Sequence, residues 1–174
     1  MNLEYFISSL PGLRYGEKSP ISEGDFRSMC ASGLNDEMGR SVSQILDGVA
    51  DGDQPASRWV ELWLAKESEI RAAIARRRAK RLGRPDAQYG RAVADTRIAP
   101  AVEAAFAEPD PLRREMALDR LRWMFAEEMQ GVQPMAPTVV YAYAAKLRLV
   151  LRRQELDEAA GAARLEQVIG KATT

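Results

Sequence analysis

The densest group of residues that could do chemistry is a run of cations between positions 71 and 84. Its central members are Arg76, Arg77, Arg78, Lys80 and Arg81. Clustered arginine and lysine side chains bind the phosphates of nucleic acid or of anionic lipid. However, no aromatic side chains on which bases could stack are interleaved with these cations. We therefore expect a solvated or protein-facing patch, with nucleic-acid binding kept as the alternative.

The chain lacks the residues that most enzymes use for acid–base or metal chemistry. It has no histidine, and Cys30 is its only cysteine. A lone thiolate without histidine cannot build a zinc site, so we expect Cys30 to be a small buried side chain. No Gly-rich phosphate loop or Gly-x-Ser-x-Gly motif occurs. We therefore predict no catalytic residue, no metal site and no cofactor, and a small-molecule enzyme is the least favoured alternative.

Charge and hydropathy place the chain among soluble proteins of the cytoplasm. Basic and acidic residues number 25 each, so the whole molecule does not attract nucleic acid or acidic lipid electrostatically. No run approaches the roughly 18 apolar residues of a membrane span. The first residues, Met1-Asn2-Leu3-Glu4-Tyr5, lack the basic start of a secretory signal. We expect a cytoplasmic protein without direct membrane insertion.

The elements that must position these residues are predicted to be helices, because apolar side chains recur with helical spacing along most of the sequence. Residues 3–10 are apolar but short, and their pattern does not decide between a strand and a helical turn. The segments predicted as helices are 22–33, 35–48, 55–82, 100–107, 111–130, 138–151 and a final one near 165–169. We predict an all-α, irregular bundle of six to seven helices, with the short N-terminal segment packed on it.

We expect one helical domain over residues 1–174, in which a loop at 84–99 could join sub-lobes 1–84 and 100–170. Capping residues mark where the helices begin, namely Ser22, Asn35, Asp110 and Thr138. Pro55 is expected in the first turn of helix 55–82, where its missing N–H costs nothing.

The predicted helix 111–130 is apolar on two sides. Leu118, Leu121, Phe125 and Met129 share one arc, whereas Leu112, Met116 and Trp123 share another on nearly the opposite side. Such a helix is sandwiched in a core or shared with a partner, so we expect it to be the spine of the fold. The residues predicted to form a protein interface lie here and in the N-terminal segment: Tyr5, Phe6, Leu10, Leu112, Met116 and Trp123.

Two separated sequence blocks are distinctive. The first is Tyr5-Phe6-Ile7-Ser8-Ser9-Leu10-Pro11, followed by Pro20-Ile21-Ser22 and Phe26. The second is Leu118-Asp119-Arg120-Leu121-Arg122-Trp123, followed by Phe125, Glu128 and Tyr143-Ala144-Ala145-Lys146-Leu147-Arg148-Leu149. Together they resemble a bacterial family of unknown function whose genes lie in operons for V-type (archaeal-type) rotary ATPases. Residues 33–100 match that family only in helical character.

Members of that family occur where the gene for the central-stalk C subunit, the d subunit of eukaryotes, is otherwise expected. That subunit is an all-helical, non-catalytic collar between the rotor ring and the central shaft, and this chain resembles a shortened form of it. The resemblance implies a structural or assembly subunit of a V-type ATP synthase/ATPase. Its partners would be other ATPase subunits of the stalk or rotor, and the complex would hold it at the inner membrane.

Overall fold

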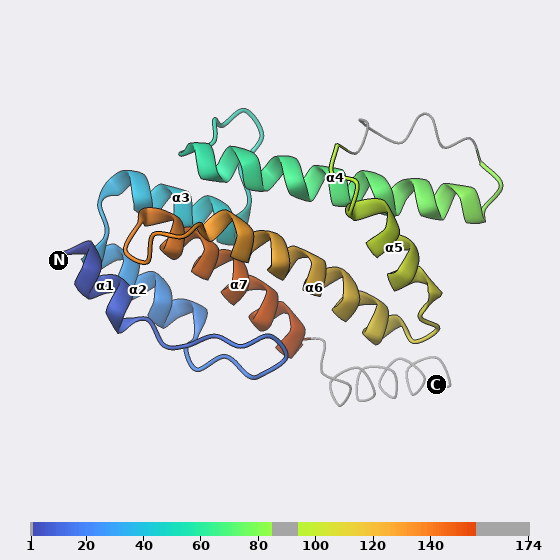
Figure 1. Cartoon of the computed structure of the whole chain (residues 1–174). Coiled ribbons are helices and arrows are strands. Elements are labelled where there is room, and N and C mark those ends of the chain that lie inside the picture. Colours follow the sequence, from blue (N-terminus) through green and yellow to red (C-terminus); the bar gives the residue numbers. More distant parts are fainter. Residues whose placement is uncertain (1, 85–93, 156–174) are drawn as a thin grey trace, which may run out of the picture.

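The computed structural model describes residues 2–84 and 94–155, and within these ranges every regular element is a helix (Figure 1). In chain order the helices are α1 (Leu3–Ser9), α2 (Glu23–Gly33), α3 (Asp36–Asp47), α4 (Arg58–Arg81), α5 (Ile98–Ala107), α6 (Pro111–Gln130) and α7 (Pro137–Glu155). The predicted all-α class is therefore confirmed. The helix predicted near 165–169 and most of the predicted loop 84–99 lie outside the described residues.

Side-chain caps begin three of the helices where the sequence predicts them. Ser22, Asn35 and Asp110 each accept a hydrogen bond from a backbone N–H of the first turn at 2.9–3.1 Å. Each such cap stabilises its helix by about 1 kcal/mol. Gly83, predicted to follow the last turn of its helix, has a φ of 64°. That left-handed conformation favours glycine, so it explains why α4 ends there.

The predicted starts of two helices are wrong. Helix α4 begins at Arg58 rather than in the turn of Pro55, because the side chain of Ser57 accepts a hydrogen bond from the Val60 N–H at 3.4 Å. Helix α5 begins at Ile98, so Pro100 lies in its first turn rather than at its start. A proline is tolerated in either position, since the first-turn N–H groups have no partner within the helix.

Thr138 does not cap α7 but lies inside it, because Pro137 takes the first helical position. The Thr138 hydroxyl instead donates a hydrogen bond to the carbonyl oxygen of Gln130 at 2.6 Å. This bond ties the start of α7 to the end of α6. It satisfies one of the carbonyl groups that a helix C-terminus leaves unpaired.

The N-terminal segment, for which strand and helical turn were both open, is the short helix α1. Its Asn2 cap accepts a hydrogen bond from the Glu4 N–H at 3.1 Å. Phe6 is fully buried, so α1 packs on the bundle through this side chain, as predicted for the segment. Burying a phenylalanine completely contributes about 1.5–3 kcal/mol.

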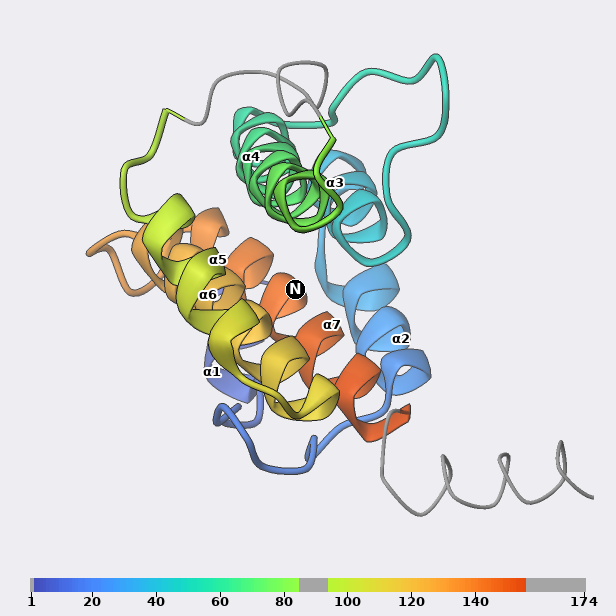
Figure 2. The same ribbon diagram turned by 90° about the vertical axis from the view of Figure 1, so that its right-hand side faces the viewer.

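Helix α7 occupies the centre of the bundle, a position predicted for helix 111–130. It packs against α1, α2, α3, α4 and α6, and Figure 2 shows it between α6 on one side and α2 on the other. Its alanines Ala142, Ala144 and Ala145 are buried, and their small size lets neighbouring helices approach from several directions. Residues 140–145 of α7 are all buried, and burial on every side of this part of the helix overrides the strand propensity of residues 138–141.

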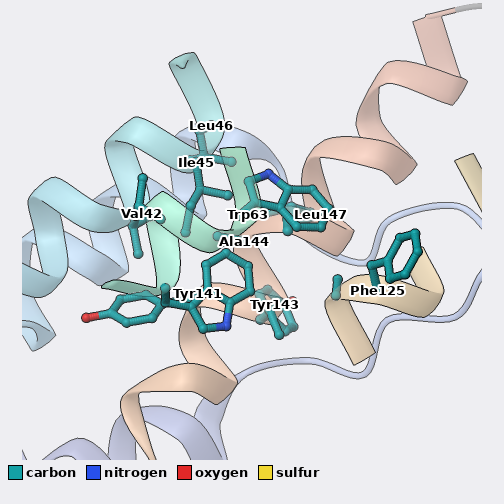
Figure 3. Close-up of a cluster of buried hydrophobic side chains, with 14 of the residues drawn as sticks. Val42, Ile45, Leu46, Trp63, Phe125, Tyr141, Tyr143, Ala144 and Leu147 are labelled. Carbon is teal, nitrogen blue, oxygen red and sulfur yellow. The ribbon is translucent and has the colours of Figure 1, made fainter. Parts of the chain in front are cut away.

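Helix α6 packs against both α5 and α7, as its two apolar arcs predict. One cluster of buried hydrophobic side chains takes residues from each of the seven described helices. Trp63, Ile45 and Leu147 lie close together in it, whereas Tyr141 and Tyr143 lie on its other side (Figure 3). Within the described ranges, no helix combines the length and the apolar character needed to cross a lipid bilayer.

Candidate functional site

The predicted cationic patch lies on the C-terminal third of α4, but its members do not share one environment. Arg78, Lys80 and Arg81 are exposed. Arg77 instead points towards α5, where its Nε lies 2.6 Å from Oε2 of Glu103 and its guanidinium lies 5.8 Å from the ring centre of Phe106. The exposed patch therefore contains fewer of these cations than the sequence suggests.

A shallow groove of about 410 Å³ lies beside these exposed cations, between the end of α4 and the turn from α5 to α6. Leu82 is 67% exposed at its edge. The lining residues are Arg78, Arg81, Leu82, Phe106, Pro111, Arg114 and Glu115. Arginine beside exposed apolar side chains is typical of protein interfaces.

The six residues predicted as an interface do not form one surface. Phe6 and Trp123 are 0% and 3% exposed and contact the chain's own core. Tyr5 is 67% exposed, whereas Leu10, Leu112 and Met116 are half-buried. Of this set, Tyr5 alone offers most of its side chain to a partner.

The segment between α1 and α2 covers the second apolar arc of α6. The ring of Tyr15 lies edge-on to Trp123 with 5.5 Å between ring centres, and its hydroxyl donates a hydrogen bond to the carbonyl oxygen of Met116. Leu13 packs on the same small cluster as Leu149. Trp123, for which we expected a partner protein, thus packs against this chain's own residues.

Exposed apolar side chains also occur at positions that the sequence did not predict. Val132 and Met135, in the loop between α6 and α7, are 99% and 44% exposed. Leu62 on α4 is also 44% exposed. The sequence does contain a sign of the exposure of Val132 and Met135, because both are large apolar residues in a segment with Gly131 and Pro134.

A second hollow, which we call the arginine cleft, lies where α3, α4, α6 and α7 meet. Its volume is about 360 Å³. Buried apolar side chains form its floor, namely Ile45, Trp63, Ala145 and Leu149. Its charged lining residues are Arg71, Arg122, Arg148, Arg152 and Glu67.

A chain of alternating charges crosses this cleft from α4 through α6 to α7. Arg122 Nε donates to both carboxylate oxygens of Glu67, at 3.0 and 3.2 Å, and its Nη1 donates to Asp119 at 3.0 Å. Arg152 donates to Asp119 at 3.5 Å and to Glu115 at 2.7 Å. The network fixes the positions of both guanidinium groups.

Asp119 is the most buried carboxylate of this network, with 5% of its side chain exposed. Burial raises the pKa of Asp119 and outweighs the lowering effect of the nearby Arg152 and Arg122. Removing one partner of such a buried pair typically costs 3–5 kcal/mol, because the other charge is left uncompensated. The network therefore links α6 to α7, and removal of a single member should destabilise their packing.

Among the described residues, the hydrogen-bond partners of the other two arginines of the cleft are backbone oxygens. Arg148 Nη1 donates to the carbonyl of Ile45 at 2.9 Å, and Arg71 Nε donates to the carbonyl of Glu67 at 3.3 Å. In the part of the chain that the structure describes, neither has a carboxylate within ion-pair distance. Both side chains are exposed, so their remaining N–H donors face solvent.

The arginine cleft was missed by sequence reasoning. In the sequence, Asp119 and Arg122 stand out only as part of a distinctive block. Their spacing of three residues, between the apolar arcs of a buried helix, nevertheless predicts an ion pair. Arg71 and Arg148 come from distant helices, so no sequence spacing relates them. Their meeting depends on how the helices pack.

The described residues place no group of three or more Asp, Glu, Cys or His side chains where they could hold a metal ion. Cys30 is buried, as expected, and burial raises the pKa of its thiol to about 12. A thiol with so high a pKa carries almost no thiolate near neutral pH, so Cys30 is neither a good nucleophile nor a good ligand.

Comparison of the chain with protein-family models, with curated proteins and with solved structures finds no match.

Proposed function

We propose that this chain is a non-catalytic structural or assembly subunit of a V-type ATP synthase/ATPase, with a role like that of the central-stalk C/d subunit. The observation that supports this is the packing of the two blocks that carry the family resemblance. Tyr143 of the second block lies 5.3 Å, ring centre to ring centre, from Phe26 of the first block. The Tyr143 hydroxyl also donates a hydrogen bond to the Pro11 carbonyl at 3.0 Å.

The physical character of the fold suits such a role. One densely packed core joins the described helices, and such cores resist compression and transmit strain. A spacer in a stalk must behave in this way. Exposed apolar residues, which mark interaction sites when they lie close together, are available at Leu82 and at Val132 and Met135 for contacts with neighbouring subunits. The complex would then hold the chain at the cytoplasmic side of the inner membrane.

The test is a strain that lacks the gene for this chain. We expect less assembled ATPase in its membranes, measured by native electrophoresis and by ATP hydrolysis, and restoration by a plasmid-borne copy. An empty plasmid is the control for the effect of transformation. An unchanged amount of complex, together with absence of the chain from the purified ATPase, would refute the proposal.

Nucleic-acid binding remains the second candidate, and the observation that favours it is the exposure of Arg78, Lys80 and Arg81 at one end of α4. It predicts salt-dependent binding to DNA or RNA that the triple substitution to alanine abolishes. Arg77 is left intact, because its ion pair with Glu103 links α4 to α5.

The matched control replaces three exposed cations elsewhere by alanine, namely Arg14, Lys18 and Arg58. It removes the same charge from the molecule. Binding that falls equally in both variants would show that only net charge matters. No binding to either nucleic acid at low salt would remove this candidate.

A further inference from the structure

We infer that the arginine cleft binds a small organic anion, in which a phosphate or carboxylate group is attached to a short apolar body. This inference is independent of the proposed ATPase role, because it rests only on the lining of the cleft. It assigns the charged group to the arginines of α4 and α7 and the apolar body to the floor.

The first support is that, among the described residues, Arg71 and Arg148 each make one hydrogen bond, which leaves their other donors open to a ligand. A guanidinium group has five N–H donors and no acceptor. Each of these two spends one donor on a backbone carbonyl, at 3.3 and 2.9 Å. The bond to Ile45 also fixes the direction of the Arg148 side chain. Both arginines are exposed, so an oxyanion in the cleft would replace water as the acceptor for their remaining donors.

The second support is the local charge balance. Four arginines line the cleft, and the carboxylates paired with them are Glu67, Asp119 and Glu115. Cations therefore outnumber anions there, although the whole chain is neutral. A concave site with low-dielectric walls concentrates the field of such an excess.

The third support is the shape and apolar character of the floor. Trp63 and Ile45 lie close together where α4 and α3 meet, as Figure 3 shows, and both are buried. The volume of about 360 Å³ falls at the lower end of the range for small-molecule sites. The cleft can thus take a ring or a short chain, whereas a nucleic-acid duplex cannot enter it.

The experiment is isothermal titration calorimetry of the full chain at low ionic strength with three probes. Phenyl phosphate carries both the charged and the apolar group, inorganic phosphate carries only the charge, and phenol carries only the ring. We expect a single saturable site for phenyl phosphate, weaker binding of inorganic phosphate and no binding of phenol. Absence of saturable binding of phenyl phosphate would overturn the inference.

Two substitutions locate the site. Arg71→Gln and Arg148→Gln should each weaken phenyl phosphate binding about tenfold, since each removes a charge-assisted hydrogen bond. The control is Arg113→Gln, which removes a cation that is 72% exposed and does not line the cleft. An equal loss in the control would overturn the inference by showing non-specific attraction.

Folding of the variants is checked by thermal unfolding. Arg148→Gln also loses the bond to the Ile45 carbonyl and should lower the melting temperature. Arg71→Gln is therefore the deciding variant, because the hydrogen bond of Arg71 stays within α4 and links no two helices. Unchanged affinity in a folded Arg71→Gln variant would contradict the assignment.

Discussion

The hydroxyl of Tyr143 donates a hydrogen bond to the carbonyl oxygen of Pro11 at 3.0 Å, across 132 residues of sequence. This bond holds the segment between α1 and α2 against the central helix α7. Burial raises the pKa of Tyr143 to about 12, so the hydroxyl keeps its proton and remains a donor through the neutral range. The same segment also packs on Trp123 of α6 through Tyr15. The hydrogen bond at Pro11 therefore helps to keep solvent from both α6 and α7.

Replacing Tyr143 by phenylalanine should lower the free energy of unfolding by about 1 kcal/mol, the usual net value of one hydrogen bond. Backbone amides of residues 12–19 should exchange hydrogen faster, because the segment loses an anchor. Chemical denaturation and hydrogen exchange measure the two effects. Tyr5→Phe is the control, since Tyr5 is 67% exposed. Unchanged exchange in Tyr143→Phe would show that the bond does not hold the segment.

Two neighbouring aromatic residues on α1 should respond very differently to truncation. Phe6→Ala should destabilise the fold by about 3–5 kcal/mol, because it leaves a cavity in the core. Tyr5→Ala should change stability by no more than about 0.5 kcal/mol, as for exposed sites. Urea denaturation of both variants compares them directly. Similar losses would mean that α1 does not pack through Phe6.

The buried carboxyl of Asp119 should leave a signature in the pH dependence of stability. Burial raises its pKa in the folded state, so above the unfolded pKa of about 3.9 the folded protein holds the proton more tightly than the unfolded chain. The stability of the natural protein relative to Asp119→Asn should therefore fall as pH rises from about 4 to the folded pKa. Denaturation curves over this range measure it. If the difference in unfolding free energy between the natural protein and Asp119→Asn stays constant or grows with pH, burial does not raise the pKa of Asp119.

Asp95 provides a control of opposite sign. Its carboxylate accepts hydrogen bonds from Arg97 at 2.8 and 3.0 Å and from Lys66 at 2.9 Å. These cations, Arg97 above all, hold the pKa of Asp95 well below its usual range. The advantage of the natural protein over Asp95→Asn should thus be present above about pH 4 and be lost as pH falls below it.

Cys30 should react with thiol reagents only after the chain unfolds. It is 5% exposed, and burial raises the pKa of its thiol to about 12, so both access and thiolate are lacking. Reaction with a chromogenic disulfide should be slower by several orders of magnitude in buffer than in denaturant. Rapid reaction of the native protein would show that α2 opens readily.

The sequence predicted those features that depend on nearby residues. Ser22, Asn35 and Asp110 cap their helices through contacts two or three residues away, so local pattern suffices. The start of α4 was misplaced because Pro55 and Ser57 are both acceptable beginnings, and only packing selects the serine. The buried position of Cys30 followed from its type and its helical spacing.

Features that depend on several helices could not be predicted. The central position of α7 arises from the combined packing of five other helices against it. Arg77 and Arg78 are adjacent in sequence, yet successive residues turn by about 100° on a helix, so Arg77 pairs with Glu103 and Arg78 is exposed. The arginine cleft likewise exists only because α3, α4, α6 and α7 converge.

The most direct test of the proposed function is purification of the V-type ATPase from cells that express this chain, through a tag on a catalytic ATPase subunit. Quantitative mass spectrometry then compares the preparation with one from untagged cells. We predict that the chain is enriched together with the stalk subunits, in the complete enzyme or in its assembly intermediates. No enrichment over the untagged control in either fraction would contradict the proposed role.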